Sequence, residues 1–309
     1  MVVVTDRGGN DTVPARAIAG RLFVVGCARS GTTLLQSLLA AHPAVLSFPE
    51  TSVFGRLLSG GVMRSFRVEA PVRGMTAAEV DRSALGSVHR RTQLAYRRTA
   101  GFLDKLGRRD LEGILPIRSK SMSQFADGFI GVLDRLALDQ GKSWWVEKSP
   151  ENVRFVREIL ELVPGAKFIN IVRDGRQNVT ALYDMARKYP DRFWVKYSDL
   201  DEAIEHWNVC IRHTRRLLGM AQVLVVRYER LVSETEAVLE EVCSFAGLPF
   251  RRDMIDRRAE TASRLMTARE PWKADVLTPM RSSPEDRFTE VFTPDQQAYI
   301  EARLERIDF

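Results

Sequence analysis

Leu22-Phe-Val-Val-Gly-Cys-Ala-Arg-Ser-Gly-Thr-Thr-Leu-Leu-Gln-Ser-Leu-Leu-Ala-Ala-His42 is the stretch that decides the fold. Its first four residues are apolar, a pattern typical of a strand that is buried on both faces. A glycine-rich turn follows at residues 26–31, and the apolar periodicity of residues 32–41 predicts a helix. Strand, glycine turn and helix are the arrangement of a phosphate-binding loop, in which backbone N–H groups and the helix N-terminus hold an anion.

The turn departs from the Walker A pattern at its end. The spacing Gly26-x-x-x-x-Gly31 matches that pattern, but Thr32 and Thr33 stand where Lys and then Ser or Thr are required. A cation occurs earlier in the turn, as Arg29. The alternative is a glycine turn with a purely structural role. Arg-Ser-Gly-Thr-Thr directly after a buried strand favours anion binding.

Length and composition indicate a globular α/β protein. The 309 residues, of which 45% are apolar and 28% charged, suffice for one large domain or a domain with an insertion. Lys and Arg number 46 against 40 Asp and Glu, which gives a net charge of +6 and a pI near 9.4. This excess favours anionic ligands, but it is too small to indicate nucleic-acid binding.

The cysteines and the apolar runs bear on the compartment. Cys27, Cys210 and Cys243 are far apart in the sequence and predict neither a disulfide framework nor a metal-ligand cluster. A reducing, cytoplasmic location is therefore expected. No apolar run reaches the roughly 18 residues of a membrane span. Residues 1–20 lack a hydrophobic signal-peptide core and are interpreted as a flexible N-terminal arm.

Strand and helix patterns alternate about five times along residues 21–309. Strand patterns occur at the residue ranges 22–25, 44–48, 143–148, 166–172 and 222–228, and the last two are predicted to be buried strands. This alternation predicts an α/β fold, a P-loop-type parallel sheet of about five strands covered by helices on both faces. We expect residues 21–309 to form a single domain. After the last strand, a helix over 231–245 and a loop or lid over 250–290 are predicted, and Thr293-Pro294 begins a final helix.

Residues 59–140 are interpreted as a mostly helical insertion on the acceptor side. Helices are predicted at 77–106 and 121–140 from their apolar spacing. Two arginine pairs, Arg90-Arg91 and Arg97-Arg98, recur seven residues apart on one face of the first helix. They belong either to a solvated face or to an acceptor pocket that prefers negative charge.

Three polar residues stand at the predicted carboxyl ends of strands, the edge where open parallel sheets bind ligands. Glu50 follows the second strand, Lys148 ends the third, and Arg173 comes directly after the fourth, where a guanidinium can grip a phosphate. A surface carboxylate and a Glu147–Lys148 surface pair are the alternatives. Ser149 can cap the helix that Pro150 begins.

Several of these stretches resemble one family, the sulfotransferases that use 3'-phosphoadenosine 5'-phosphosulfate (PAPS). Residues 26–35, with Leu38-Leu39 and His42-Pro43, resemble the 5'-phosphosulfate loop in the Arg-containing form common in bacterial and carbohydrate sulfotransferases. Further likenesses are Glu147-Lys-Ser-Pro150 with Asn152, Ile171-Val-Arg-Asp-Gly-Arg176 to the 3'-phosphate motif, Val226-Arg-Tyr-Glu-Arg-Leu-Val232, Gly247-Leu-Pro249 and Trp272-Lys273.

The resemblance implies in-line sulfuryl transfer from PAPS, with 3',5'-adenosine bisphosphate as product and no required metal. The acceptor is then a hydroxyl or amine of a small molecule, glycan or natural product. The implied catalytic residues are Glu50 as base, with Lys148 and Arg29 stabilising charge. The implied cofactor-binding residues are Arg29, Ser30, Gly31, Thr32, Thr33, Arg173, Thr180, Tyr228, Trp272 and Lys273.

Two departures from the family pattern concern the 3'-phosphate. Ala181 and Gln177 stand where the family has serine and aspartate, so Thr180 is a substitute and Arg173 carries more of the contact. Two rival interpretations stay open: a P-loop small-molecule kinase, and a nucleotide-binding module that has lost catalysis. His42 is the reserve candidate for the base, whereas His206 and His213 are expected to be ordinary helical residues.

Overall fold

A five-stranded parallel sheet forms the centre of the computed structural model, which describes residues 17–59, 77–190, 193–265 and 286–309. The strands are β1 (Gly20–Gly26), β2 (Val45–Ser47), β3 (Trp144–Lys148), β4 (Lys167–Val172) and β5 (Val223–Arg227). Their order in the sheet is β2-β3-β1-β4-β5, and every neighbouring pair is parallel. The predicted α/β class and strand number are confirmed.

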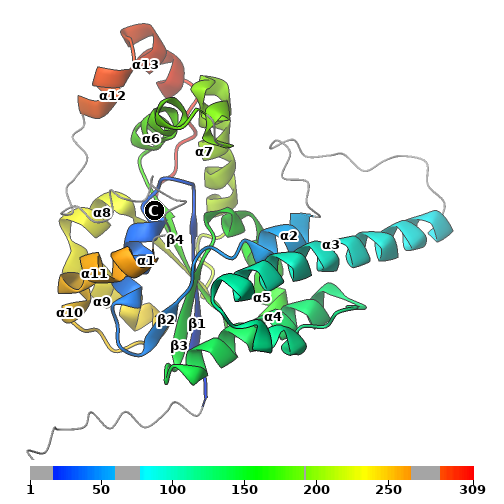
Figure 1. The fold of residues 1–309 in the computed structure, drawn as a ribbon. Coiled ribbons are helices and arrows are strands. Elements are labelled where there is room, and N and C mark those ends of the chain that lie inside the picture. Colours follow the sequence, from blue (N-terminus) through cyan, green and yellow to red (C-terminus); the bar gives the residue numbers. More distant parts are fainter. Residues whose placement is uncertain (1–16, 60–76, 191–192, 266–285) are drawn as a thin grey trace, which may run out of the picture.

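Helices cover both faces of this sheet (Figure 1). One face carries α1 (Thr32–Ala40), α8 (Tyr228–Ser233), α9 (Thr235–Ala246), α10 (Asp253–Asp256) and α11 (Arg258–Leu265). The other carries α2 (Val53–Ser59), α3 (Ala77–Lys105), α4 (Met122–Asp139), α5 (Val156–Leu162), α6 (Gly175–Lys188) and α7 (Leu200–Arg215). Three 3-10 helices, η1 (Arg109–Ile114), η2 (Pro150–Phe155) and η3 (Phe193–Ser198), connect elements, and α12 (Asp286–Val291) and α13 (Pro294–Glu301) follow. Among the described helices, none is both long and apolar enough to cross a bilayer.

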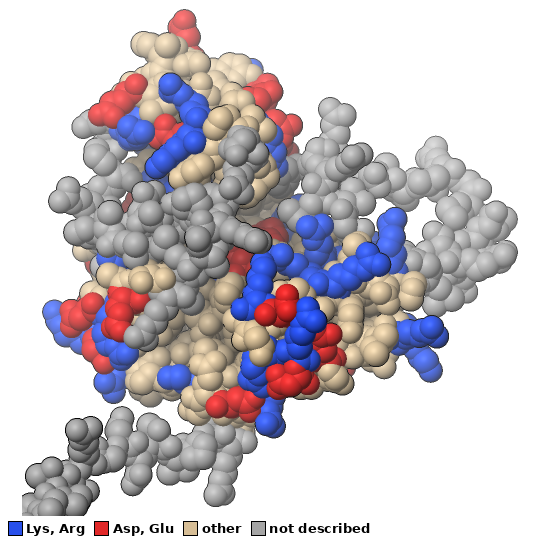
Figure 2. All heavy atoms as spheres, in the orientation of Figure 1, with Lys and Arg blue, Asp and Glu red and all other residues tan. Residues whose placement is uncertain are grey.

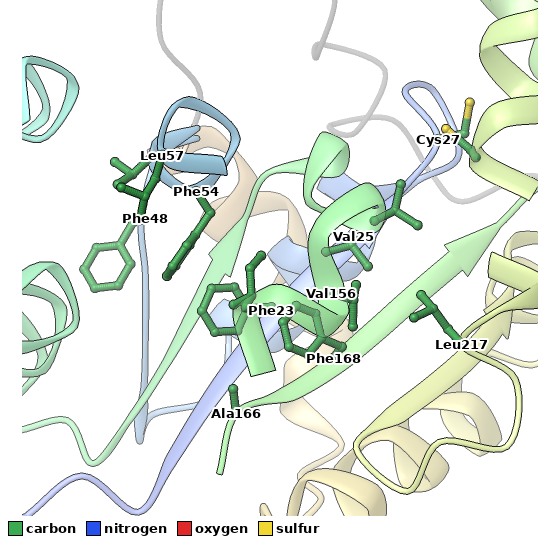
Figure 3. Close-up of a cluster of buried hydrophobic side chains, with 14 of the residues drawn as sticks. Phe23, Val25, Cys27, Phe48, Phe54, Leu57, Val156, Ala166, Phe168 and Leu217 are labelled. Carbon is green, nitrogen blue, oxygen red and sulfur yellow. The ribbon is translucent and has the colours of Figure 1, made fainter. Parts of the chain in front are cut away.

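The central strand β1 is buried on both faces because its side chains alternate between two apolar cores. Leu22 and Val24 pack against α1 and α9, and Phe23 and Val25 pack into the core under the other helices. In that second core the Phe23 and Phe168 rings stack with centroids 4.9 Å apart (Figure 3). Because both faces of β1 are buried, every residue from 22 to 25 is apolar, and the predicted burial of this strand on both faces is confirmed.

Side-chain caps define several helix starts. The Ser121 hydroxyl accepts a hydrogen bond from Gln124 N at the start of α4, and Asp174 accepts from Gln177 N at the start of α6. Thr293 forms a capping box with Gln296 at the start of α13. The predicted helices over 121–140 and from 293 onward are therefore confirmed to within about a residue.

Three local predictions differ from the structure. β5 was predicted to be buried, but it is the edge strand, and only Val226 among its residues is fully buried. The helix predicted over 231–245 is two helices, α8 and α9, which meet at Glu234. Three short helices, α10, α11 and the start of α12, occupy part of the 250–290 segment that was predicted to be a loop or lid. The N-terminal arm was predicted for residues 1–20, of which 1–16 lie outside the described residues.

The strand order brings the predicted polar residues to one edge of the sheet. Because all strands are parallel, their carboxyl ends share that edge. Glu50 follows β2, Lys148 ends β3, the glycine-rich loop follows β1, Arg173 follows β4 and Tyr228 follows β5. In space these positions run in the same sequence across the sheet, with the loop at the centre.

Candidate functional site

The glycine-rich loop at residues 26–31 joins β1 to α1 in a shape that only glycine permits at its two ends. Gly26 has φ 150° and Gly31 has φ 90°, in the region that disfavours side chains. A Cβ at Gly31 would lie 2.4 Å from the Tyr228 ring, and one at Gly26 would lie 2.4 Å from the Ile171 carbonyl oxygen. Since the N-cap Gly31 has no side chain, no oxygen of its own caps the first amides of α1. These amides and the helix dipole are suited to an external anion.

Backbone strain is concentrated at this edge of the sheet. Among the described residues, two non-glycine residues have positive φ: Arg29 at 67° and Ser52 at 50°. Arg29 lies in the loop, and Ser52 lies two residues after Glu50. A non-glycine residue in this region costs on the order of 1–3 kcal/mol and is held there by its surroundings, most often at functional sites.

Asn178 on α6 fixes the loop from the neighbouring helix. Its Nδ2 donates to the Ala28 carbonyl oxygen at 2.9 Å and to Ser30 Oγ at 3.0 Å. Its Oδ1 accepts from Cys27 Sγ at 3.3 Å. Asn178 and Ser30 are fully buried. One amide therefore contacts three residues of the loop.

Arg173 brings a second guanidinium to the loop. Its Nη1 donates to the Arg29 carbonyl oxygen at 3.1 Å, and its guanidinium carbon lies 4.8 Å from the centre of the Tyr228 ring. Burial lowers the pKa of Arg173, and the nearby Arg29 charge lowers it as well. Two guanidinium groups this close repel each other, so an anion between them relieves that repulsion. Gln177 Oε1 accepts from Arg173 at 3.3 Å.

Glu50 and Lys148 form an ion pair beside the loop. Lys148 is 1% exposed at the end of β3, while the Glu50 side chain is 29% exposed. The pair therefore joins a buried cation to a carboxylate that solvent or a ligand can reach. The predicted alternative of a Glu147–Lys148 surface pair is wrong, because both residues are buried and Lys148 bonds to Glu50.

Arg98 of α3 supports the backbone that carries Glu50. Its Nε donates to the Thr51 carbonyl oxygen at 2.5 Å, and its Nη2 donates to the Glu50 carbonyl oxygen at 3.1 Å. Arg91, one of the same predicted pairs, donates to the Leu58 carbonyl oxygen at 3.2 Å. Thus one arginine of each pair packs inward, and Arg90 and Arg97 stay exposed. Blue side chains gather over α3 on the face shown in Figure 2.

A second carboxylate, Glu147, is fully buried under the site. It accepts hydrogen bonds from Thr51 Oγ1 at 2.7 Å, Ser149 Oγ at 2.5 Å and Asn152 Nδ2 at 3.3 Å. Burial raises the pKa of Glu147 to about 7. Ser149 was predicted to cap the following helix, but its hydroxyl is used here and in accepting from Ser52 N at 2.9 Å. This network connects β3 to the strained segment after Glu50.

A third carboxylate, Glu151, lies close to Glu50. Burial raises the pKa of Glu151, and the charge of Glu50 raises it further, whereas Lys148 lowers it. Both carboxyl groups, Glu50 and Glu151, therefore interact with the buried ammonium group of Lys148. Glu151 and Asn178 were not predicted as site residues, and Arg98 was predicted only as part of a solvated face or an acceptor pocket, not as a support for the Glu50 backbone. Glu151 could have been found from its position in the Glu147-Lys-Ser-Pro-Glu151 run after a strand.

Not every predicted residue joins the site. Thr32 and Thr33 begin α1 as predicted. Thr180 is buried, and its hydroxyl donates to the Arg176 carbonyl oxygen of its own helix at 2.7 Å. Trp272 and Lys273 lie outside the described residues.

His42 is at the wrong edge of the sheet to act as a base. It precedes β2, whereas Glu50 follows that strand. Its Nδ1 accepts from Ala44 N at 3.1 Å, and burial lowers its pKa. His42 is therefore not placed to act as the reserve base.

The glycine loop lies between a parallel strand and a helix, with two arginines, a lysine and a carboxylate at its rim. This arrangement is suited to an anionic ligand at the sheet edge of an α/β protein. Residues 21–252 match the family model described as the sulfotransferase family. The chain belongs to the sulfotransferase family.

Similarity to individual proteins agrees with this family. The chain is 25% identical over 232 residues to a protein-tyrosine sulfotransferase of Drosophila melanogaster, covering 74% of this chain and 38% of that protein. It is 25% identical over 251 residues to protein-tyrosine sulfotransferase A of Caenorhabditis elegans, covering 80% of this chain and 53% of that protein. The chain thus spans about half, or less, of the length of these relatives.

A solved structure shares the fold. The sulfotransferase domain from the curacin biosynthetic pathway aligns with a TM-score of 0.55 at 18% identity, and the alignment covers 94% of this chain and 99% of that one. At this identity the likeness establishes the fold alone.

Proposed function

We propose that this chain transfers a sulfuryl group from PAPS to a hydroxyl or amine of a small-molecule, glycan or natural-product acceptor. The observation that carries the proposal is the grouping of the 26–31 loop, Arg173 and the Glu50–Lys148 ion pair at one sheet edge. An anion site lies there next to a carboxylate that can receive a proton.

The residues at this edge fit the charge of PAPS. The loop amides and Arg29 suit the 5'-phosphosulfate, because the α1 N-terminus and a guanidinium both favour anions. Arg173 and Tyr228 are the proposed contacts for the 3'-phosphate and its surroundings. Gln177 already accepts a hydrogen bond from Arg173 and so takes part in orienting that guanidinium. Trp272 and Lys273 remain proposed contacts on the grounds of the family motif.

Each residue of the ion pair has a role in the proposed reaction. PAPS supplies an activated sulfuryl group, which leaves the 5'-phosphate as the acceptor attacks in line. Glu50 receives the proton of the acceptor, for which its partly exposed carboxylate is suited. Lys148 keeps that carboxylate oriented and, with Arg29, adds fixed positive charge near the departing phosphate. These fixed cations do the work that Mg²⁺ does in a kinase, so the proposed reaction uses no metal ion.

The kinase alternative depends on features that this loop lacks. A P-loop kinase requires a lysine where Thr32 stands. The lost-catalysis alternative depends on Ala181 and Gln177, but Glu50, Lys148, Arg29 and Arg173 are all retained.

A transfer assay with radiolabelled donors tests the proposal. The chain is incubated with sulfuryl-labelled PAPS and a panel of phenolic, sugar and amine acceptors, phenols being included because the relatives are named for protein tyrosine. A parallel arm uses γ-labelled Mg-ATP. We expect label on an acceptor from PAPS only. Transfer from ATP instead would support a kinase, and tight binding of PAPS without transfer to any acceptor would support the lost-catalysis alternative.

A further inference from the structure

Two cysteines and a histidine that are far apart in the sequence meet behind the loop. One ligand atom from each of Cys27, His206 and Cys210 lies within 4.8 Å of the others. His206 and Cys210 are one turn apart on α7 and so share a helix face, and Cys27 is the first residue after β1. The prediction that the cysteines form no metal-ligand cluster was wrong about this geometry, because the sequence spacing did not reveal that α7 packs against the loop.

The site is enclosed by the apolar core. Cys27 is 4% and Cys210 5% exposed, and Cys27 lies at one end of the buried cluster in Figure 3. Burial raises the pKa of the Cys27 thiol, and the Cys210 thiol beside it raises the pKa further. Two core cysteines with no ligand are the ordinary alternative, and Cys243 is an example, buried on the other face of the sheet.

The histidine is oriented by a second residue, as it is in many metal sites. Its Nδ1 lies 3.1 Å from the hydroxyl of Tyr197, a buried residue of η3. This contact assigns Nδ1 to Tyr197 and Nε2 to the thiols. A neutral imidazole with Nδ1 held in this way can act as a ligand. The Cys27 thiol donates to Asn178 Oδ1 at 3.3 Å, and this hydrogen bond is given up when the thiol loses its proton.

We propose that Cys27, His206 and Cys210 bind a zinc ion. Ligand atoms around tetrahedral zinc lie about 3.5–3.8 Å apart, given bonds of about 2.3 Å to sulfur and about 2.0 Å to nitrogen. The ligand atoms of the cluster lie within 4.8 Å of one another, so zinc binding requires them to draw closer to this spacing. Two thiolates and a neutral imidazole balance the charge of Zn²⁺, so the complex is neutral in a buried site. Each thiol gives up its proton on binding.

Zinc at this position ties the start of the loop to α7. Three protein ligands leave one tetrahedral position, which a water molecule can fill. The ion has a structural role, and the proposal does not depend on sulfuryl transfer. Soft thiolate ligands favour zinc over Mg²⁺, so magnesium is the negative control ion.

Zinc titration of the reduced, chelator-treated chain in competition with a chromophoric chelator tests this proposal. We expect one Zn²⁺ per chain with a Kd below about 1 μM. Co²⁺ in its place is expected to produce the thiolate charge-transfer and tetrahedral absorption bands. Cys210→Ser and His206→Gln are each expected to weaken zinc binding at least ~100-fold. Cys243→Ser, the matched buried cysteine, is expected to leave it unchanged.

Three results would overturn the zinc site: no stoichiometric zinc binding by the wild-type chain, equal affinity in Cys210→Ser, or loss of two free thiols to a disulfide under mild oxidation despite bound zinc. Thermal melts of the metal-free variants check that they fold. If a variant fails to fold, the wild-type stoichiometry and the Co²⁺ spectrum still decide.

Discussion

At the scale of single residues, Glu50 and Lys148 form the contact on which the proposed chemistry depends. A buried lysine holds a carboxylate that remains 29% exposed. We predict that Glu50→Gln lowers kcat by at least ~100-fold, because the amide cannot take up the acceptor proton. The Kd for adenosine bisphosphate, measured by calorimetry, is expected to stay within about 2-fold of wild type, since the substitution leaves the loop intact.

Glu158→Gln is the control for this substitution, because Glu158 is an exposed glutamate on α5. It is expected to leave both kcat and the Kd unchanged. Unaltered turnover in Glu50→Gln would show that another group acts as the base, and Glu151 would then be the next residue to test.

Glu147 is expected to make stability depend on pH. Its pKa is raised by burial from 4.5 to about 7, so the folded state retains the proton more strongly than the unfolded state. The contribution of the protonated Glu147 to the free energy of unfolding is fully present below pH 4.5 and is lost as the pH rises through about 7. Over that window we predict that the wild-type chain loses on the order of 3 kcal/mol relative to Glu147→Gln.

Denaturant unfolding of both proteins at a series of pH values provides this comparison. Glu158→Gln again serves as the control, with a difference from wild type that stays constant with pH. A constant difference for Glu147→Gln as well would mean that Glu147 has the same pKa in the folded and unfolded states.

Some site residues could be predicted from the sequence because a residue at the end of a parallel strand lies at the ligand-binding edge of the sheet. Glu50, Lys148 and Arg173 each stand at the end of a recognisable strand. Arg98 and Asn178 could not be found in this way, since the backbone groups that they hold lie 48 and 150 residues away in the chain. Their roles depend on tertiary packing.

At the scale of elements, the loop depends on the left-handed Gly31. We predict that Gly31→Ala costs about 1–3 kcal/mol of stability and weakens adenosine bisphosphate binding at least ~10-fold. The reasons are its φ of 90° and the 2.4 Å approach of a Cβ to the Tyr228 ring. Unfolding and titration calorimetry measure the two effects.

Gly141→Ala is the matched control. Gly141 also has a left-handed φ, 66°, but a Cβ there meets nothing within 4 Å. Gly141→Ala is expected to lower stability by about 1–2 kcal/mol through backbone conformation alone and to leave adenosine bisphosphate binding unchanged. Equal effects of the two substitutions on binding would contradict the role given to the loop.

The connection between α6 and the loop is tested by Asn178→Ala. Removing this side chain leaves Ser30 Oγ and the Ala28 carbonyl without their amide donor. We expect a loss of about 1–3 kcal/mol in stability and weaker binding of adenosine bisphosphate.

Asn170→Ala is the control for this connection. Asn170 is a buried asparagine of β4 that donates to Thr214 Oγ1 at 2.8 Å, away from the loop. It is expected to lower stability similarly without changing the Kd. If both variants bind adenosine bisphosphate like wild type, Asn178 has no role in shaping the site.

Most elements could be predicted because local signals agreed with the final structure. The cap Thr293 and the glycine turn at 26–31 each marked a boundary correctly. β5 was misjudged because an apolar β-branched run has the same composition at the edge of a sheet as at its centre. The break between α8 and α9 lies in the polar run Ser233-Glu-Thr-Glu236, which fits the solvent-facing part of one helix as well as a junction between two.

At the scale of the whole molecule, the alternation of strands and helices predicted the α/β class, but not the strand order. β3 lies between β1 and β2 although 96 residues separate the end of β2 from the start of β3. That order brings Lys148 between Glu50 and the loop. It also packs the 77–139 helices on the same face as α7, away from α1. The cluster of Cys27, His206 and Cys210 could not be predicted either, because only the tertiary packing of α7 brings it next to the loop.

The proposed function requires that the sheet edge binds a bisphosphorylated adenosine through fixed cations. Titration calorimetry of the chain with 3',5'-adenosine bisphosphate, without added metal, beside a titration with Mg-ATP tests it most directly. We predict a Kd of about 10 μM or tighter for the bisphosphate and binding at least ~100-fold weaker for Mg-ATP. Tight binding of Mg-ATP with none of the bisphosphate would contradict the proposed function.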